Sequence, residues 1–157
     1  MKAGRITVST RKFEVKDIPM PHPGSGEVRI KVGAAGVCLS DVHFLDGTLS
    51  PGYLKGDEVT LGHEVAGTID SLGEGVHTFK AGDRVLVIAG ERNENNQITT
   101  LGFDYDGGYA EYVIAKASLI VKIPDALPFE EAAIIPDAVS TPWAAISSTA
   151  KMERGET

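Results

Sequence analysis

The sequence predicts a mainly β fold (β-rich α+β), built as a barrel or sandwich of short strands with short helices towards the C-terminus. Three observations support this class. Apolar and polar residues alternate with a period of two in several short stretches. Eighteen glycines and eight prolines, most of them before residue 110, are typical of tight turns between strands. After Pro124 the residue pattern changes to one that favours helices.

Six strands are expected. The alternation is clearest at 27–35, where valine and isoleucine share one face and Arg29 and Lys31 share the other, as in a half-buried strand. Similar β-branched runs, each bounded by Gly, Pro or Asp, occur at 5–8, 65–72, 84–88, 110–115 and 119–123. Many short strands with turn signals between them indicate a barrel or sandwich.

Residues 90–108 are expected to form one long loop between two strands, since this stretch is polar and lacks periodicity. Loops of this length are usually functional or mobile.

A helical segment is expected over residues 125–157. Pro128 followed by Glu130 and Glu131 suits the start of a helix, because acidic side chains interact favourably with the helix dipole there. Pro136 is expected to stop this first helix early.

Thr141 and Pro142 are expected to be the N-cap and first residue of a second helix that continues through Ile146. Trp143 in this helix either narrows a pocket or lies in the hydrophobic core, and the core is the preferred interpretation.

Charge and composition exclude several classes of function. The 157 residues carry 22 acidic and 15 basic side chains, a net charge of −7, with no basic block, so nucleic acid is not an expected partner. One cysteine cannot form an intrachain disulfide, which favours a reducing compartment. With no signal peptide or membrane-length apolar run, we expect a cytoplasmic protein that does not bind membranes.

The densest polar cluster is CLSDVH, starting at Cys38, and GHE with His63 follows about one hairpin later. A thiolate and an imidazole near carboxylates are suitable zinc ligands. A site with one cysteine would have to include a carboxylate, and Asp41, Glu64 and Asp137 are all candidates. The alternative is that the lone cysteine is a small buried apolar residue.

Other signals are weak. His22, between two prolines, and His77, in a Gly-bounded connection, are expected to be surface residues. Neither GxGxxG nor GxxxxGK[ST] occurs, so these residues carry no dinucleotide or phosphate cradle of their own.

Five ordered motifs together resemble one family. They are GEVRIKVGAAGVCLSDVHFLDG, LGHEVAGTIDSLGEGV, FKAGDRVLV, GGYAEYVIA and IIPDAVSTPWAAI, and they cover nearly the whole chain. The sequence resembles the amino-terminal catalytic domain of the zinc-dependent medium-chain alcohol dehydrogenases. The resemblance implies a GroES-like barrel over 1–157, without the family's Rossmann domain, in a parent enzyme that uses one catalytic zinc and NAD or NADP.

The resemblance also implies site roles. Cys38 and His63 match the first two ligands of the catalytic zinc, and Asp137 stands where many members place a cysteine and others an acid. Glu64 matches a residue that exchanges with these ligands or lies behind them. Asp41 matches the carboxylate that orients the ligand imidazole.

For proton transfer the resemblance assigns Ser40 as the hydroxyl that takes the proton of the substrate alcohol and His43 as the far end of the relay. Thr141 matches a position beside the nicotinamide ring, a role that competes with its expected role as a helix cap. The implied reaction interconverts small-molecule alcohols and aldehydes or ketones in a parent that is a homo-oligomer, and the 157-residue chain alone is expected to be inactive.

Two departures from the family pattern matter. The loop 90–108 has no cysteines, so it stands in place of a lobe that carries a structural zinc in many relatives, and no such zinc is expected. Leu39 replaces an arginine that some relatives place on the cofactor phosphate.

Two alternatives remain open from the residues. The chain is either a catalytic domain or a non-catalytic GroES-like binding or interaction module, because fold alone does not determine function. A zinc-free relative of the quinone-reductase type is disfavoured by Cys38, His63 and Asp137.

Overall fold

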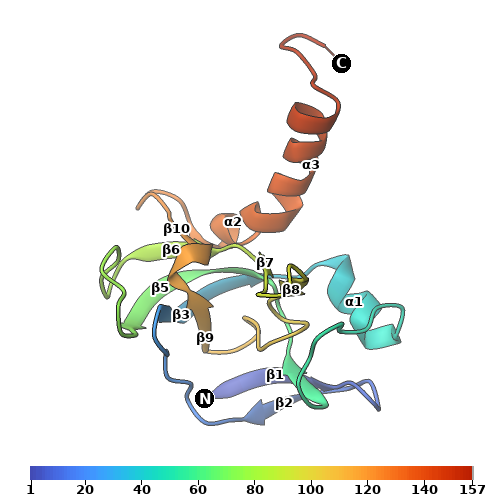
Figure 1. Cartoon of the computed structure of the whole chain (residues 1–157), viewed down its shortest axis with the longest axis vertical. Helices are drawn as coiled ribbons and strands as arrows, with labels where there is room; N and C mark the ends of the chain where they lie inside the picture. Colours follow the sequence, from blue (N-terminus) through green and yellow to red (C-terminus); the bar gives the residue numbers. More distant parts are fainter. Residues whose placement is uncertain (157) are drawn as a thin grey trace.

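The computed structural model describes residues 1–156 and contains one five-stranded antiparallel sheet at its centre (Figure 1). The strand order is β10-β6-β5-β3-β9. These strands are β3 (Glu27–Gly36), β5 (Glu64–Leu72), β6 (Arg84–Val87), β9 (Tyr112–Lys116) and β10 (Ile120–Lys122). All five were expected from the alternation, because each buries one face in a common core of valine, isoleucine and leucine side chains.

A second sheet has the order β2-β1-β4, with β1 (Lys2–Thr7) between β2 (Lys12–Asp17) and β4 (Glu58–Thr60). Only β1 was expected. Strand β2 exposes its apolar Phe13 and Val15, so it buries no apolar face, and β4 has only three residues. These two strands are therefore defined by pairing with β1 and leave little pattern in the sequence.

Residues 90–108 are not a structureless loop, so that expectation was wrong. They contain the hairpin of β7 (Gly90–Arg92) and β8 (Ile98–Thr100). The side chain of Asn93 stabilises the turn by accepting hydrogen bonds from the backbone N–H groups of Asn95 and Gln97, both at 3.0 Å. A hairpin tied by polar side chains shows no hydrophobic periodicity.

The CLSDVH motif begins a helix, α1 (Leu39–Asp46), which was not expected. The carboxylate of Asp41 accepts a hydrogen bond of 2.9 Å from the backbone N–H of Cys38, just before the helix, and Gly47 ends the helix with a φ of +87°. Phe44 anchors α1 in a small core with Ile6, Val59 and Leu61. Cys38 is thereby fixed between the end of β3 and the start of α1.

The first helix ends early, before Pro136, as expected: α2 spans Phe129–Ala133 and has Ile134 as its C-cap. The continuation was not expected, because the chain goes on as a π-helical turn, η2 (Ile135–Val139), then as α3 (Ser140–Ala144) and a second π-helical turn, η3 (Ala145–Thr149). Pro136 lies in the first turn of η2, where a missing N–H breaks no helical bond. The wider turn is closed by a hydrogen bond of 3.3 Å from Val139 N–H to the carbonyl of Ile134.

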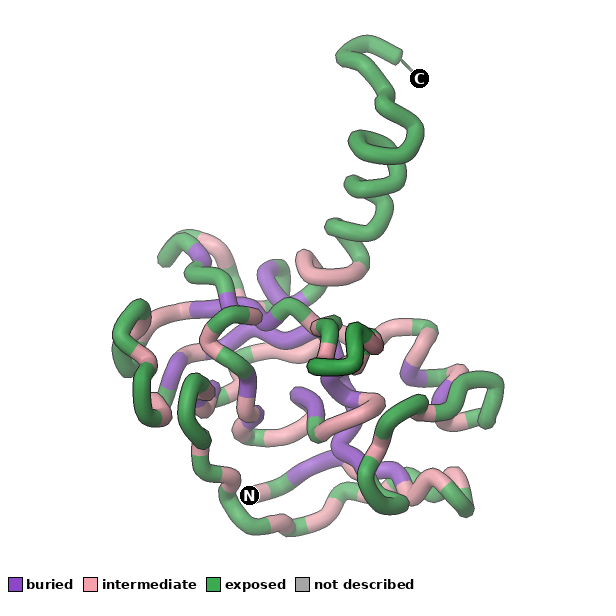
Figure 2. Tube along the Cα trace, viewed as in Figure 1, coloured by how far each residue is buried: buried purple, intermediate pink, exposed green. Residues whose placement is uncertain are grey.

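Helix α2 is anchored on the central sheet, whereas the helical segment after η2 stands away from the sheets (Figure 2). Ala132 and Ala133 pack on Leu86 of β6, and the Arg84 guanidinium lies 4.0 Å from the ring centroid of Phe129. Trp143 is 69% exposed, so its assignment to the core was wrong. Among residues 1–156 no helix is both long and apolar enough to cross a membrane.

Candidate metal centre

Four potential metal ligands converge at one end of the central sheet. One ligand atom from each of Cys38, His63, Glu64 and Asp137 lies within 4.8 Å of the others. Cys38 follows β3, His63 and Glu64 stand at the start of β5, and Asp137 comes from the η2 turn. Of the three carboxylates that the residue pattern left open, the structure places Glu64 and Asp137 in the cluster and Asp41 behind it.

The pairing of β3 with β5 brings the first two motifs together. Gly36 is opposite Glu64 in this pair, and a Cβ at Gly36 would collide with the Glu64 carboxylate. Gly62 has a φ of +95°, and a Cβ there would meet the ring of Tyr109 at 2.5 Å. The glycine in LGHE therefore allows the chain to turn tightly around Tyr109 just before it delivers His63.

His63 is only 3% exposed and lies between two carboxylates. Its Nδ1 is 3.6 Å from Asp41 Oδ1, and its Nε2 is 3.4 Å from Asp137 Oδ2. The ring of Phe103 lies over the imidazole, with centroids 5.0 Å apart. The imidazole thus presents one nitrogen to the cluster and the other to a buried carboxylate.

Burial and charge act in opposite directions on these groups. Burial lowers the pKa of His63, but the Asp41 carboxylate and the Cys38 side chain outweigh it and raise this pKa to about 9. Burial raises the pKa of Asp41, yet the neighbouring His63 imidazole and hydrogen bonds from the Cys38 amide and the Tyr109 hydroxyl bring it below its usual value. Burial keeps the pKa of Glu64 above its usual value.

The donor set fits a divalent cation of the zinc type. Thiolate, imidazole and carboxylate are all ordinary zinc ligands. The Glu64 and Asp137 carboxylates both lie close to the Cys38 sulfur. Within residues 1–156, no Lys or Arg forms an ion pair with either carboxylate. Among the described residues, Asp41 Oδ1 and His63 Nδ1 are buried and have no hydrogen-bond partner. The two atoms face each other at 3.6 Å, an arrangement typical of a carboxylate that orients a metal-ligating imidazole.

A cavity of about 280 Å³ opens beside the cluster and is lined by Ser40, His63 and Asp137, with Phe103 and Ile88 among its walls. Ser40 Oγ is 3.6 Å from Cys38 Sγ. His43 does not line this cavity within the described part of the chain; it is half-buried further along α1.

Thr141 does not cap a helix, which corrects the sequence prediction, because it lies inside α3. Its hydroxyl donates a hydrogen bond of 2.8 Å to Asp137 Oδ1, one helical turn back. Thr141 thus holds the carboxylate whose other oxygen faces His63. Both His22 and His77 are exposed, as expected.

Sequence reasoning missed Phe103 and Tyr109. Phe103 lies in the segment 90–108, which is expected to be a loop, and the local sequence pattern does not show that its ring contacts His63. Tyr109 lies in the GGYAEY motif, directly before the expected strand 110–115. Its hydroxyl donates a 2.7 Å hydrogen bond to Asp41 Oδ2, a contact across 68 residues that only the tertiary structure shows.

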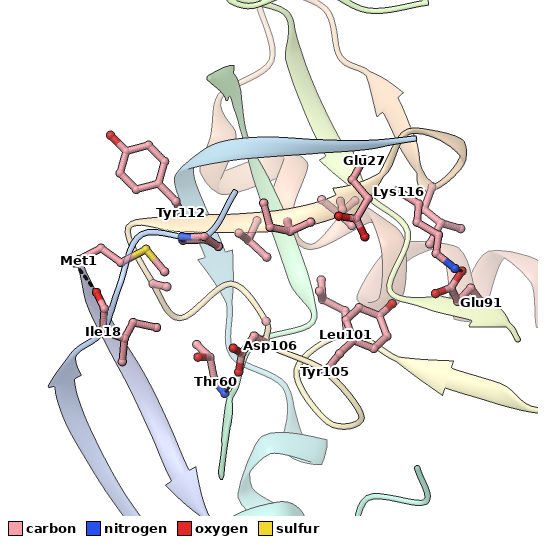
Figure 3. Close-up of a pocket in the computed structure, with 18 of the residues that line it drawn as sticks. Met1, Ile18, Glu27, Thr60, Glu91, Leu101, Tyr105, Asp106, Tyr112 and Lys116 are labelled. Carbon is pink, nitrogen blue, oxygen red and sulfur yellow. Dashed lines mark hydrogen bonds and ion pairs between the residues drawn. The ribbon is translucent and has the colours of Figure 1, made fainter. Parts of the chain in front are cut away.

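A larger cavity, of about 530 Å³, lies away from the cluster along β9 (Figure 3). Its walls include Leu101, Tyr105 and Tyr112, and an ion pair of 2.7 Å between Lys116 and Glu91 lies at one end. None of the predicted site residues lines it. The site is therefore located by its ligand chemistry and not by cavity volume.

Several known proteins are similar to this chain in sequence and in fold. An alcohol dehydrogenase of Geobacillus stearothermophilus is 35% identical over 164 residues, covering 95% of this chain and 48% of the relative. A zinc-type alcohol dehydrogenase-like protein of Escherichia coli is 33% identical over 158 residues, covering 85% of this chain and 43% of the relative. A solved NAD-dependent alcohol dehydrogenase superposes with a TM-score of 0.86 at 31% identity, covering 99% of this chain and 49% of that one.

The chain thus spans about half the length of the curated relatives it matches. Residues 24–125 match the family of the alcohol dehydrogenase GroES-like domain. The mainly β GroES-like fold expected from the motifs is confirmed by this match and by the superposition. The chain belongs to the alcohol dehydrogenase GroES-like domain family.

Proposed function

We propose that the chain is the metal-binding catalytic domain of a zinc-dependent oxidoreductase that interconverts alcohols and aldehydes or ketones by hydride transfer to NAD or NADP. The observation that carries this proposal is the convergence of Cys38, His63, Glu64 and Asp137 beside a cavity of about 280 Å³, in a chain of this family. The zinc-type relative and the NAD-dependent solved structure support the choice of metal and cofactor.

Cys38, His63 through Nε2 and Asp137 are the proposed ligands, and Glu64 stands close enough to exchange with one of them. A zinc ion held there supplies Lewis acidity, which lowers the pKa of the hydroxyl of a bound alcohol. Asp41 holds the imidazole so that Nε2 faces the metal. The site takes one catalytic zinc, and no structural zinc is proposed, because the chain has a single cysteine.

Ser40 is the proposed acceptor of the substrate's proton, because its hydroxyl lines the cavity near Cys38. A hydroxyl can pass on a proton but does not store it, so a group that titrates near neutrality is needed further along. His43, three residues later on the same helix, is the proposed end of this relay. The proposed proton route from Ser40 to His43 runs along one face of α1, since residues three apart are neighbours on a helix.

The cofactor is proposed to be held by a part of the parent protein outside these residues, with Thr141 beside the nicotinamide ring. These residues contain no GxGxxG, and the relatives are about twice as long. The parent is proposed to be a cytoplasmic homo-oligomer that acts on small molecules and binds neither nucleic acid nor membranes.

Metal content tests the proposal directly. The chain purified without chelators should hold one zinc per molecule by elemental analysis, and Cys38→Ala and His63→Ala should each reduce this to well below 0.2 per chain, on the order of the loss expected when one of three ligands is removed. His77→Ala is the matched control, because His77 is exposed and outside the cluster. Substoichiometric zinc in the wild-type chain, not restored by added zinc, would favour the non-catalytic binding module instead.

A further inference from the structure

Tyr109 occupies a tightly fixed position behind the metal centre. Its backbone N–H donates to the carbonyl of Leu61 at 2.8 Å, and its carbonyl accepts from the N–H of Gly4 at 2.6 Å. Its ring lies against Gly62, the residue before His63. Backbone and ring are therefore both held in place, and the phenol has little freedom to turn away from the site.

The phenol of Tyr109 and the backbone N–H of Cys38 both donate to the same oxygen of Asp41. The distances to Asp41 Oδ2 are 2.7 Å from the Tyr109 hydroxyl and 2.9 Å from the Cys38 nitrogen. The carbonyl of Gly36 is a weaker alternative acceptor for the phenol, at 3.0 Å. Because both donors lie on Oδ2, the other oxygen, Oδ1, is turned towards His63 Nδ1.

We propose that Tyr109 is a positioning residue that acts through Asp41 on the ligand His63 and thereby sets the affinity of the centre for its metal. This inference rests on the proposed function. Asp41 is buried, and a carboxylate there needs fixed donors to hold one orientation. With Tyr109 in place, Oδ1 stays turned towards His63 Nδ1 at 3.6 Å, which favours the proton on Nδ1 and leaves the lone pair of Nε2 for the metal.

Removing the phenol hydroxyl leaves Asp41 with one donor fewer on Oδ2 and allows the carboxylate to rotate. Loss of a hydrogen bond behind a metal ligand typically weakens metal binding by roughly 10- to 100-fold. Since the Cys38 amide still holds Asp41, the lower end of this range, about tenfold, is expected for Tyr109→Phe.

The test compares Tyr109→Phe with Tyr105→Phe. The control removes a phenol that lines the larger cavity and whose hydroxyl forms no hydrogen bond within residues 1–156. Zinc affinity is measured by competition with a chromogenic chelator, and the visible spectrum of the Co²⁺-substituted chain reports the ligand field. Tyr109→Phe should bind zinc about tenfold more weakly and shift the Co²⁺ bands, while Tyr105→Phe stays within about twofold of the wild type.

An Asp41→Asn background separates positioning from a general structural role. There, adding Tyr109→Phe should cause little further loss of affinity, because both changes break the same chain of contacts. Equal zinc affinity in Tyr109→Phe and Tyr105→Phe, or additive losses with Asp41→Asn, would overturn the inference. A wild-type chain that binds no zinc would overturn the proposed function itself, a distinguishable result.

A measurement on the wild-type chain covers the case in which Tyr109→Phe does not fold. The phenol proton of Tyr109 should be visible by NMR as a slowly exchanging, downfield-shifted resonance coupled to Asp41 across the hydrogen bond. A rapidly exchanging Tyr109 phenol would contradict the proposal.

Discussion

At the scale of single residues, the candidate metal centre depends on which carboxylates lie close to the Cys38 sulfur and the His63 imidazole. Motif order selects Asp137, and the structure places its Oδ2 3.6 Å from Cys38 Sγ and 3.4 Å from His63 Nε2. Glu64 joins the same cluster because it is the first residue of β5, directly after His63. Asp41 lies behind the cluster, with its Oδ1 3.6 Å from His63 Nδ1.

The titration of His63 predicts how zinc affinity depends on pH. The pKa of His63 is raised to about 9 in the metal-free chain, so below that pH a proton occupies the nitrogen that the metal needs. Apparent zinc affinity should therefore rise with pH from 6.5 towards 9, by up to about tenfold per pH unit from this group, and then level off. Chelator competition across this range checks it, and a flat profile would contradict the proton competition.

At the scale of elements, Cys38, His63 and Glu64 lie at the ends of strands, whereas Asp137 lies in the middle of the η2 turn. The pairing of β3 with β5 fixes the position of Cys38 relative to His63. The packing of α2 on β6 fixes the position of Asp137 relative to these two residues. Asp137 lies within the π-helical turn η2, which has Pro136 near its start. The sequence pattern predicted the early end of the first helix but not this turn, which supports Asp137.

Gly62 gives a stability prediction at this scale. Gly62→Ala should lower the free energy of unfolding by about 2–4 kcal/mol, because it combines a positive φ with a collision against Tyr109. Gly75→Ala is the matched control, since Gly75 has a φ of +80° but open space around it, and its cost should be about 1 kcal/mol. Urea unfolding monitored by circular dichroism measures both. Equal losses in the two variants would show that the contact with Tyr109 is not limiting.

At the scale of the whole molecule, the chain holds a candidate metal centre and a small cavity but spans only about half the length of its curated relatives. The segment after Asp137 leaves the sheets (Figure 1). Val139, Trp143 and Ile146 in this segment are exposed. Exposed apolar side chains at helical spacing are typical of a surface that packs against further protein.

The 157-residue chain by itself should therefore bind zinc without catalysing hydride transfer. Absorbance at 340 nm with NAD or NADP and a panel of alcohols should show no turnover above a zinc-only blank, while the metal content stays near one per chain. Turnover at an enzyme-like rate, on the order of 1 s⁻¹ or more, would contradict this prediction.

The sequence by itself determined the strands of the central sheet, because a buried face imposes its period on the residues, and it determined the family, because five motifs occur in order. Tertiary structure alone decided the rest. Short edge strands, the β7–β8 hairpin and the π-helical turn at Pro136 leave no periodic signal, since they are stabilised by pairing or by single polar contacts. The link from Tyr109 to Asp41 and His63 depends on where side chains point across distant segments, and spacing along a chain does not specify that direction.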